Sequence, residues 1–343
     1  MRTALVTTTI NVPTVLKLFQ HNHALNRVND PAFFVAGDLK TPSEAEAFCK
    51  TIPNCFYLSP KKQDEWKCSA LIPFNCIQRR NIAILEALKW GADIIILCDD
   101  DNASIARGSY FDTFFDIITT PFDGLQVGSG GWFDYGRWQF PVEGAPVSQR
   151  GMPYVEQDDY VGHVVGAQIG VAQGICLGDP DTSAIDRIAR RPVIHQVSEL
   201  LREGVVVHPD TKTVFNSQNS AILRELVPAF FLAPYLGRND DIYGSLICRR
   251  IMRERGLYLH VGKPFVYQQR NEHDLLRDLA AEMYGMERIM AFTALLDGLY
   301  LSEGPVLAQA RQIWAGMSHA RILPAQSCEA ASAFLDDCDK AMA

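Results

Sequence analysis

The segment ADIIILCDDDNA, residues 92–103, restricts the possible folds of this chain more than any other stretch. Its aliphatic run, residues 94–97, suits a strand that is buried on both faces, as in a parallel sheet. The run ends in Asp99, Asp100 and Asp101. Adjacent carboxylates repel one another and are costly to remove from water without a partner. The segment therefore predicts a buried strand with a cation at its carboxyl end.

Short aliphatic runs alternate with helical patterns through the first hundred residues, which is typical of a parallel sheet with crossover helices. Ser43 is expected to cap a helix and Gly91 to end one. The sequence thus predicts an α/β fold with a Rossmann-like, mixed and mainly parallel sheet flanked by helices. We expect strands at 4–10, 32–38, 55–60 and 93–101, and helices at 12–25, 43–52 and 75–92.

The second half of the chain changes character more than once. Residues 120–185 are rich in Gly, Pro and aromatic residues, which indicates long loops and short strands. A helix is expected at 240–256, a strand at 257–269, and amphipathic helices from about residue 275 to the end. The predicted organisation is a catalytic domain at 1–280 with a helical C-terminal extension, 281–343, packed on it.

Composition excludes several classes of protein. The chain has 343 residues, of which 48% are hydrophobic and 21% charged, so a folded core is expected. A net charge of -8 argues against nucleic acid and anionic membranes as partners. The nine cysteines form no C-x-x-C pair, which favours a reducing compartment over disulfides or a zinc knuckle. No apolar stretch reaches the roughly 18 residues of a membrane span, and we expect a cytoplasmic protein.

The aspartate cluster has two interpretations. Ligands of open α/β sheets gather beyond the carboxyl ends of the strands, where a hard divalent cation could bridge the carboxylates to nucleotide phosphates. Alternatively, the cluster is a solvated acidic turn before a helix that begins near Ala103, with Asn102 or Ser104 as its cap. A D-x-D pattern alone does not separate the two.

Several motifs together resemble a known family. IIILCDDDN, preceded by RRNIAILEALKWGA, resembles the D-x-D region of GT-A fold glycosyltransferases, which use nucleotide-sugar donors. More narrowly, the chain is similar to the STELLO proteins and, more distantly, to the reversibly glycosylated polypeptides that act as UDP-arabinopyranose mutases. The resemblance spans roughly residues 4–280 and implies a GT-A fold. It continues in FFVAGDLKTP (33–42), QGICLGDPDTSAID (173–186) and VYQQRNEHDLLRDL (266–279).

The resemblance implies a metal site and a nucleotide site. Mn²⁺ or Mg²⁺ would be held by Asp101, by Asp99 and by His273 as third ligand, while Asp100 remains the least certain of the acidic run. Other residues at strand ends and at a helix start would bind the nucleotide or its phosphates. Each also has a structural explanation: threonine suits strands, Asp38 suits a turn, and arginines suit a solvated helix surface. This nucleotide-binding set is Thr7, Thr8, Thr9, Asp38, Arg79 and Arg80.

Further residues are implied around the sugar. Asp179 or Asp181 in the turn GDPD would contact sugar hydroxyls, unless the turn is only structural. Asp240 or Asp241 would act as the base that deprotonates the acceptor, although both would also suit a helix N-terminus. Arg270 would neutralise the leaving diphosphate.

Four other residues lie in the middle segment. Trp132 and Trp138 would either stack on a sugar ring or fill a core. Arg137 and Arg150 are compatible with a transferase and with a mutase.

The predicted function is therefore metal-dependent transfer of a sugar from a nucleotide donor, with UDP favoured, to an unknown acceptor. A pyranose/furanose mutase of nucleotide sugars is the first alternative, and a non-catalytic nucleotide-sugar-binding protein is the second. The expected partners are the UDP-sugar and the acceptor, with no nucleic acid and no membrane span. Self-association into a homo-oligomer stays open.

Overall fold

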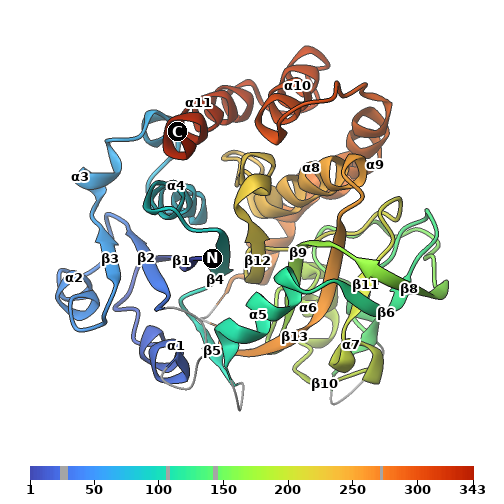
Figure 1. The fold of residues 1–343 in the computed structure, drawn as a ribbon, viewed down its shortest axis with the longest axis horizontal. Coiled ribbons are helices and arrows are strands. Elements are labelled where there is room, and N and C mark those ends of the chain that lie inside the picture. Colours follow the sequence, from blue (N-terminus) through green and yellow to red (C-terminus); the bar gives the residue numbers. More distant parts are fainter. Residues whose placement is uncertain (24–29, 106–108, 142–145, 271–272) are drawn as a thin grey trace.

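The computed structural model describes residues 1–23, 30–105, 109–141, 146–270 and 273–343. Within them a single sheet of 13 strands forms the centre of the protein (Figure 1). The strands are β1 (Thr3–Thr9), β2 (Ala32–Gly37), β3 (Cys55–Leu58), β4 (Ile94–Cys98), β5 (Asn102–Ser104), β6 (Phe122–Val127), β7 (Gln139–Pro141), β8 (Val161–Ala167), β9 (Ile169–Gly178), β10 (Ile194–Val197), β11 (Val205–Val207), β12 (Asn219–Leu223) and β13 (Tyr258–Gln268). The α-helices are α1 (Leu16–His23), α2 (Glu44–Cys49), α3 (Pro60–Gln63), α4 (Arg80–Trp90), α5 (Tyr110–Thr119), α6 (Ala184–Arg190), α7 (Glu199–Glu203), α8 (Asp240–Glu254), α9 (Leu275–Gly298), α10 (Val306–His319) and α11 (Ala325–Met342). Short 3-10 turns are η1 (Lys67–Leu71), η2 (Ile77–Arg79), η3 (Tyr135–Trp138), η4 (Arg224–Ala229) and η5 (Gly237–Asn239).

The order of the strands places the ends of distant segments together. Along the sheet the order is β3-β2-β1-β4-β12-β9-β13-β11-β6-β8. The first four strands are parallel, β12 is antiparallel to β4 and to β9, and β9 is parallel to β13. The carboxyl ends of β4, β9 and β13 and the amino end of β12 therefore meet at one edge. The fold is α/β, with a mixed sheet flanked by helices and with C-terminal helices, as predicted.

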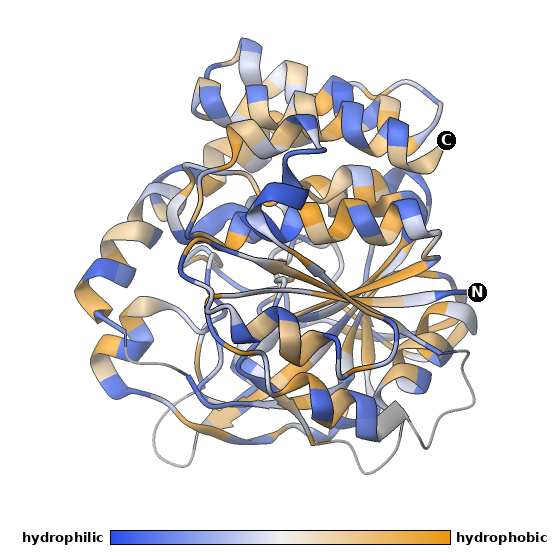
Figure 2. Cartoon of the chain, turned by 90° about the vertical axis from the view of Figure 1, so that its left-hand side faces the viewer, coloured by the Kyte–Doolittle hydropathy of each residue, from blue (hydrophilic) through white to orange (hydrophobic). Residues whose placement is uncertain are grey.

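Two hydrophobic clusters cover the two faces of this sheet. One contains α4, α8, α10 and α11, and the other contains α1 and α5. All five residues of β4 are buried, which agrees with its uninterrupted apolar run. Figure 2 shows the apolar residues concentrated on the strands and on the helix faces turned toward them.

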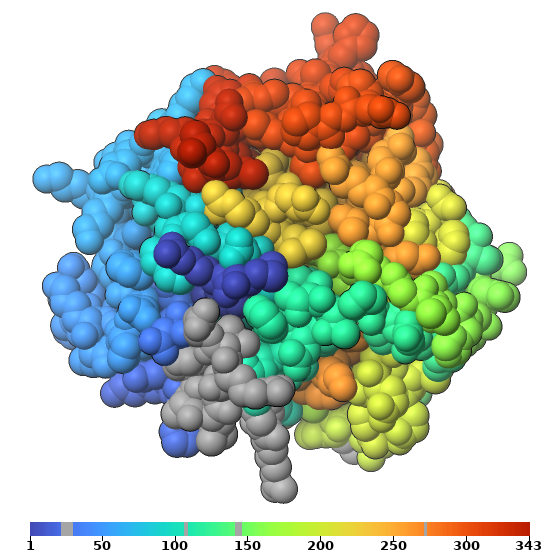
Figure 3. All heavy atoms as spheres, in the orientation of Figure 1, coloured from blue at the N-terminus to red at the C-terminus, as the bar shows by residue number. Residues whose placement is uncertain are grey.

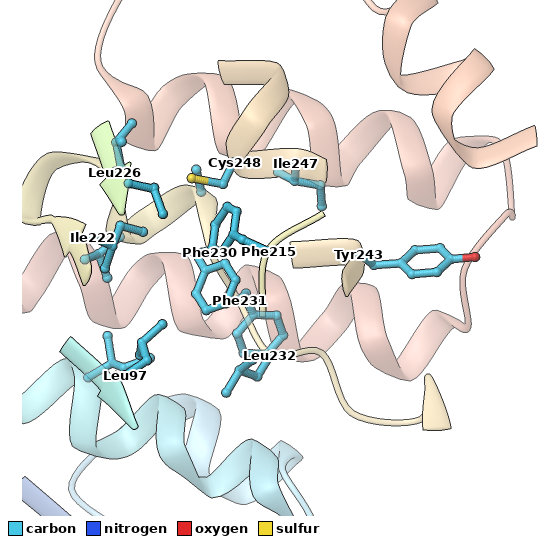
Figure 4. Close-up of a cluster of buried hydrophobic side chains, with 14 of the residues drawn as sticks. Leu97, Phe215, Ile222, Leu226, Phe230, Phe231, Leu232, Tyr243, Ile247 and Cys248 are labelled. Atoms are coloured by element: carbon cyan, nitrogen blue, oxygen red, sulfur yellow. The ribbon is translucent and has the colours of Figure 1, made fainter. Parts of the chain in front are cut away.

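The α8 helix belongs to the interior of the protein, because a layer of later helices covers it. The C-terminal helices, red in Figure 3, lie across the top of the molecule in that view. Beneath them, Phe215 and Phe230 stack with ring centroids 5.1 Å apart, beside Cys248 and Ile247 of α8 (Figure 4). This packing fixes α8 against the sheet from two sides.

Some local predictions need correction. The Ser43 side chain forms no capping hydrogen bond, and the predicted helix at 75–92 begins with the turn η2 before α4. Asn102–Ser104 form the strand β5, and the next helix, α5, begins at Tyr110 with Ser109 as its cap. The expectation of a helix that begins near Ala103 is therefore wrong, although Asp100 and Asp101 do lie in a turn between β4 and β5. Gly91, at φ 89°, ends α4 as predicted.

The domain division remains a prediction, and α9 runs through its proposed boundary at residue 280. All nine cysteines are free thiols. Among the described residues, none of the helices has the length and apolar character that a membrane crossing requires.

Candidate active site

A cavity of about 190 Å³ opens at the sheet edge where β4, β9 and β13 end and α8 begins. The predicted site residues converge there from segments that lie far apart in the sequence. Those that line the cavity are Asp99, Asp101, Asp181, Asp240, Asp241, Arg270 and His273. A larger cavity, of about 460 Å³, lies beside β3 and contains none of these residues.

The three consecutive aspartates have three different partners. Asp99 accepts a hydrogen bond from Arg80 Nη2 at 2.6 Å. Asp100 accepts one from Thr9 Oγ1 at 2.5 Å, so it points toward the end of β1. Asp101 turns toward the end of β13 instead. The three carboxylates therefore point in different directions. Among the described residues, only Asp99 has a direct cationic partner.

Asp101 is the least compensated of the three. Its carboxylate accepts from Gln268 Nε2 at 3.1 and 3.2 Å, and Gln268 is held in turn by Gln218. Burial, reinforced by the charge of Asp99, raises the pKa of Asp101 to about 7. A bound cation would reverse that shift, because it would favour the charged carboxylate.

Asp181 forms the centre of an arginine cluster. Its carboxylate lies 2.7 Å from Arg150 Nη2, 2.6 Å from Arg238 Nη2 and 2.8 Å from Arg270 Nη2. Burial acts to raise the pKa of Asp181, but the three guanidinium groups together hold it well below its usual range. A carboxylate with these three partners positions arginines and has little capacity left for sugar hydroxyls.

The adjacent carboxylates at the start of α8 have opposite environments. Asp241 accepts from Arg150 Nη2 at 3.0 Å and from the backbone N–H of Ser217 at 3.0 Å. Asp240 accepts from Gln78 Nε2 at 2.8 Å, and no cationic side chain in the described chain pairs directly with it. Burial, with Asp241 beside it, raises the pKa of Asp240 to about 7. Asp240 is therefore suited to exchange a proton near neutral pH, whereas Asp241 is committed to its ion pair.

His273 lies on the wall of the same cavity. Its Nδ1 is 3.1 Å from a carboxylate oxygen of Asp278. Histidines that bind metals commonly contact a carboxylate through the other ring nitrogen, so this geometry leaves Nε2 as the candidate ligand atom. Within the residues that the structure describes, however, no three His, Cys, Asp or Glu side chains already form a metal-binding group.

The proposed nucleotide residues at the ends of β1 and β2 are connected to this site through Asp100. Thr41 Oγ1 donates to the carbonyl of Thr9 and accepts from the backbone N–H of Asp38. Asp38 also accepts from the backbone N–H of Cys76 at 3.3 Å. The side chains of Thr7 and Thr9 are buried, and Thr8 is half-buried. Their contact with a nucleotide stays a prediction.

Arg79 does not belong to the site. It is fully buried, and its guanidinium donates to Gln63, Ser69 and Ile72 and lies 4.2 Å from the ring centroid of Phe74. It cannot reach a phosphate without breaking these bonds, so the prediction for Arg79 is wrong. Arg80 does reach the site, but its contact there is with Asp99.

Other predicted residues also have structural partners. The side chain of Asp179 is 37% exposed and pairs with Arg187 at 3.3 Å. Trp132 is buried in the core, and Trp138 packs edge-on against Phe133.

The two arginines of the middle segment differ. Arg137 is exposed beside Asp159, whereas Arg150 is almost fully buried between Asp181 and Asp241.

Several site residues were not predicted from the sequence, namely Gln78, Arg238 and Gln268. Arg238 lies two residues before Asp240, which is a weak signal, but its pairing with Asp181 joins positions 57 residues apart. Gln268 lies inside the motif 266–279, but it carries no charge that could have indicated a role, and Gln78 stands just before the quoted segment that begins at Arg79.

The sequence matches no protein-family model, and it matches no curated protein. Distant likenesses exist to solved structures. Glucosyl-3-phosphoglycerate synthase from Mycobacterium tuberculosis, in complex with UDP, is 13% identical over 88% of this chain and 82% of that chain, with a TM-score of 0.44. The same enzyme in complex with Mn²⁺ and UDP-glucose is 12% identical over 88% of this chain and 80% of that chain, with a TM-score of 0.42. S. aureus TarS, residues 1–349, is 11% identical over 100% of this chain and 90% of that chain, with a TM-score of 0.39.

Proposed function

We propose that this protein is a metal-dependent GT-A glycosyltransferase that moves a sugar from a nucleotide donor, with UDP favoured, to an acceptor that is still unknown. One observation carries the proposal: Asp99 and Asp101 share a cavity with Arg270 and with Asp240, which pairs directly with no cationic side chain among the described residues. That combination supplies carboxylate ligands, a candidate base and a candidate stabiliser of the leaving group. We further propose that the protein is most similar to the STELLO proteins within this class of glycosyltransferases.

The donor set fits Mn²⁺ or Mg²⁺. Carboxylate oxygens of Asp99 and Asp101 suit a hard cation, and Nε2 of His273 would complete the set. Burial is the main cause that raises the pKa of Asp101 to about 7, and a bound cation would favour its charged form. When bound, the cation would supply charge neutralisation for the diphosphate leaving group.

The residues of the chain would divide the remaining tasks. Asp240 would accept the proton of the acceptor hydroxyl, since its pKa lies near neutral pH. Arg270 would stabilise negative charge on the departing diphosphate. Asp181 would act as a positioning residue, because it fixes Arg270 and Arg150 at once, and Asp241 would hold Arg150 from its other side.

The mutase alternative shares the donor site but transfers the sugar to no external acceptor. Purified protein is incubated with Mn²⁺ and a panel of UDP-sugars, with and without candidate acceptor alcohols, and both UDP release and the ring form of the sugar are measured. We expect acceptor-dependent UDP release. Ring isomerisation in the absence of acceptor would instead support the mutase, and donor binding without any turnover would support a binding protein.

The donor is identified by thermal stabilisation. Because a ligand that binds only the native state raises the melting temperature by mass action, the matching nucleotide sugar should do so in the presence of Mn²⁺. Asp101→Asn should remove this metal dependence. Equal stabilisation of both proteins with and without Mn²⁺ would contradict the proposed metal site.

A further inference from the structure

A second cluster of charged residues lies at the far half of α8, away from the candidate active site. We define the Arg249 pocket as a cavity of about 30 Å³ between the loop 209–213, the α8 segment 246–253 and the α9 segment 293–297. It shares no lining residue with the cavity that contains Asp240. Along α8, the nine-residue step from Asp240 to Arg249 corresponds to roughly 13 Å. The pocket is therefore a separate feature of the molecule.

Arg249 is an almost completely buried cation, 5% exposed. Its Nη2 donates to the carbonyls of His208 and Thr211, both at 2.9 Å, which holds the loop after β11 against α8. Its Nε and Nη1 are buried without a hydrogen-bond partner among the described residues. Burial lowers the pKa of Arg249 to about 10. The fold thus holds a guanidinium with two donor atoms unused.

The neighbouring charges do not neutralise Arg249. Lys212 Nζ and Arg253 Nη1 both pair with Asp297, at 3.0 and 3.1 Å, and Arg250 pairs with Glu254. Asp210 is the other carboxylate here, and it is exposed and 4.0 Å from Arg253 Nε. Across the described residues, no carboxylate lies within ion-pair distance of Arg249 itself. The cationic side chains around the cavity outnumber the carboxylates. Arg249, which is deeply buried, is the cation that is left without an ion pair among the described residues.

A second unpartnered polar group belongs to Thr213, another residue that lines the same cavity. Thr213 is fully buried, and its Oγ1 has no hydrogen-bond partner in the described chain. A buried polar group without a partner is costly, and a buried charge without a counter-ion is costlier still. Water could supply hydrogen bonds to Thr213 and Arg249, but it could not supply the missing negative charge.

We propose that the Arg249 pocket is a binding site for a phosphate group. A phosphate offers the negative charge that Arg249 lacks and oxygens that accept from guanidinium and hydroxyl donors. The small volume admits the phosphate and little else. Any organic group attached to it would extend toward solvent, where the more exposed lining side chains include Asp210, at 61%, Lys212, at 31%, and Arg253, at 27%. The ligand is thus free phosphate or the terminal phosphate of a larger molecule.

The test uses the full chain and measures melting temperature in sodium phosphate, in glycerol 3-phosphate and in sodium chloride at equal ionic strength. We expect phosphate to raise the melting temperature by about 2 °C or more relative to chloride. An equal effect of glycerol 3-phosphate would show that the rim admits a phosphate ester, whereas an effect of inorganic phosphate alone would identify the free anion. No difference between phosphate and chloride would overturn the proposal.

Single substitutions test whether the effect of phosphate on the melting temperature arises at the Arg249 pocket. Arg249→Met should abolish the response to phosphate, whereas Arg270→Met, in the candidate active site, and Arg202→Met, an exposed arginine on α7, should retain it. Retention of the response in Arg249→Met would overturn the proposal. Should that variant fail to fold, Thr213→Val decides, because it removes only a hydroxyl. Calorimetry should then show phosphate affinity about tenfold weaker, as expected for one lost hydrogen bond, and unchanged affinity would refute the site.

Discussion

Asp181→Asn tests the arginine cluster, because it removes the charge at its centre while keeping the shape of the side chain. Breaking a buried ion pair typically costs about 3–5 kcal/mol. Here Arg150 would keep Asp241, and Arg238 would keep Glu282. Arg270 would keep only a longer contact with Asp179, at 3.7 Å, so the loss falls mainly on Arg270. We therefore expect a destabilisation near the lower limit, about 3 kcal/mol, which corresponds to a melting temperature about 4 °C lower for a chain of this size.

The matched control lies in the same turn. Asp179→Asn removes a carboxylate that is 37% exposed, and the loss of such an exposed pair should cost no more than about 1 kcal/mol. Both variants and the wild type are unfolded by heat and by urea at pH 7. Equal, small losses in the two variants would refute the idea that Asp181 organises the cluster.

Acidification provides an independent check on the same residue. The pKa of Asp181 is depressed in the folded protein, so its contribution to stability is present above the usual carboxyl pKa and is lost as pH falls through the folded value. The difference between wild type and Asp181→Asn should therefore be largest near neutral pH and should shrink below about pH 4. A difference that grows on acidification would contradict the depressed pKa.

Three further predictions concern single residues. Asp101→Asn should abolish Mn²⁺-dependent UDP binding in calorimetry, while Asp100→Asn, whose partner is Thr9, should retain most of it; unchanged affinity in Asp101→Asn would mean that the cluster binds no metal. Asp240→Asn should lower kcat by about 100- to 10,000-fold, and because the pKa of Asp240 is raised to about 7, wild-type activity should fall as pH drops below 7; a pH-independent wild-type rate would exclude Asp240 as the base. Arg79→Met should lower stability by about 3 kcal/mol, since buried carbonyls lose a charged donor, and should leave the KM for the donor unchanged; a raised KM would return Arg79 to the site.

The strands and helices that carry the site were easier to predict from the sequence than the contacts between its side chains. The run before Asp99 predicted β4, and the helix start at Asp240 was placed correctly, because both depend on local patterns of hydrophobicity and charge. The arginine cluster depends instead on pairs such as Arg270–Asp181, 89 residues apart. Only the tertiary fold brings such pairs together.

Arg79 and Arg80 show why adjacent residues are hard to separate from sequence. Arg79 ends the turn η2 and Arg80 begins α4, where successive positions point roughly 100–120° apart. One guanidinium therefore enters the packing beside η1, while the other reaches Asp99. Both positions carry the same residue type, and no local feature indicates which one faces the ligand. The difference is decided by where η1 and the end of β4 lie relative to the helix.

The position of β4 between β1 and β12 has a consequence for the dynamics of the site. Its five residues are buried, and its neighbours cover it on both sides, so its amides should exchange hydrogen only through global unfolding. The backbone that carries Asp99 is then among the last parts of the molecule to open. Local opening of α9, which is buried on one face, or of the β8 edge would leave the backbone of β4 in place. Slow amide exchange along β4 would record that rigidity directly.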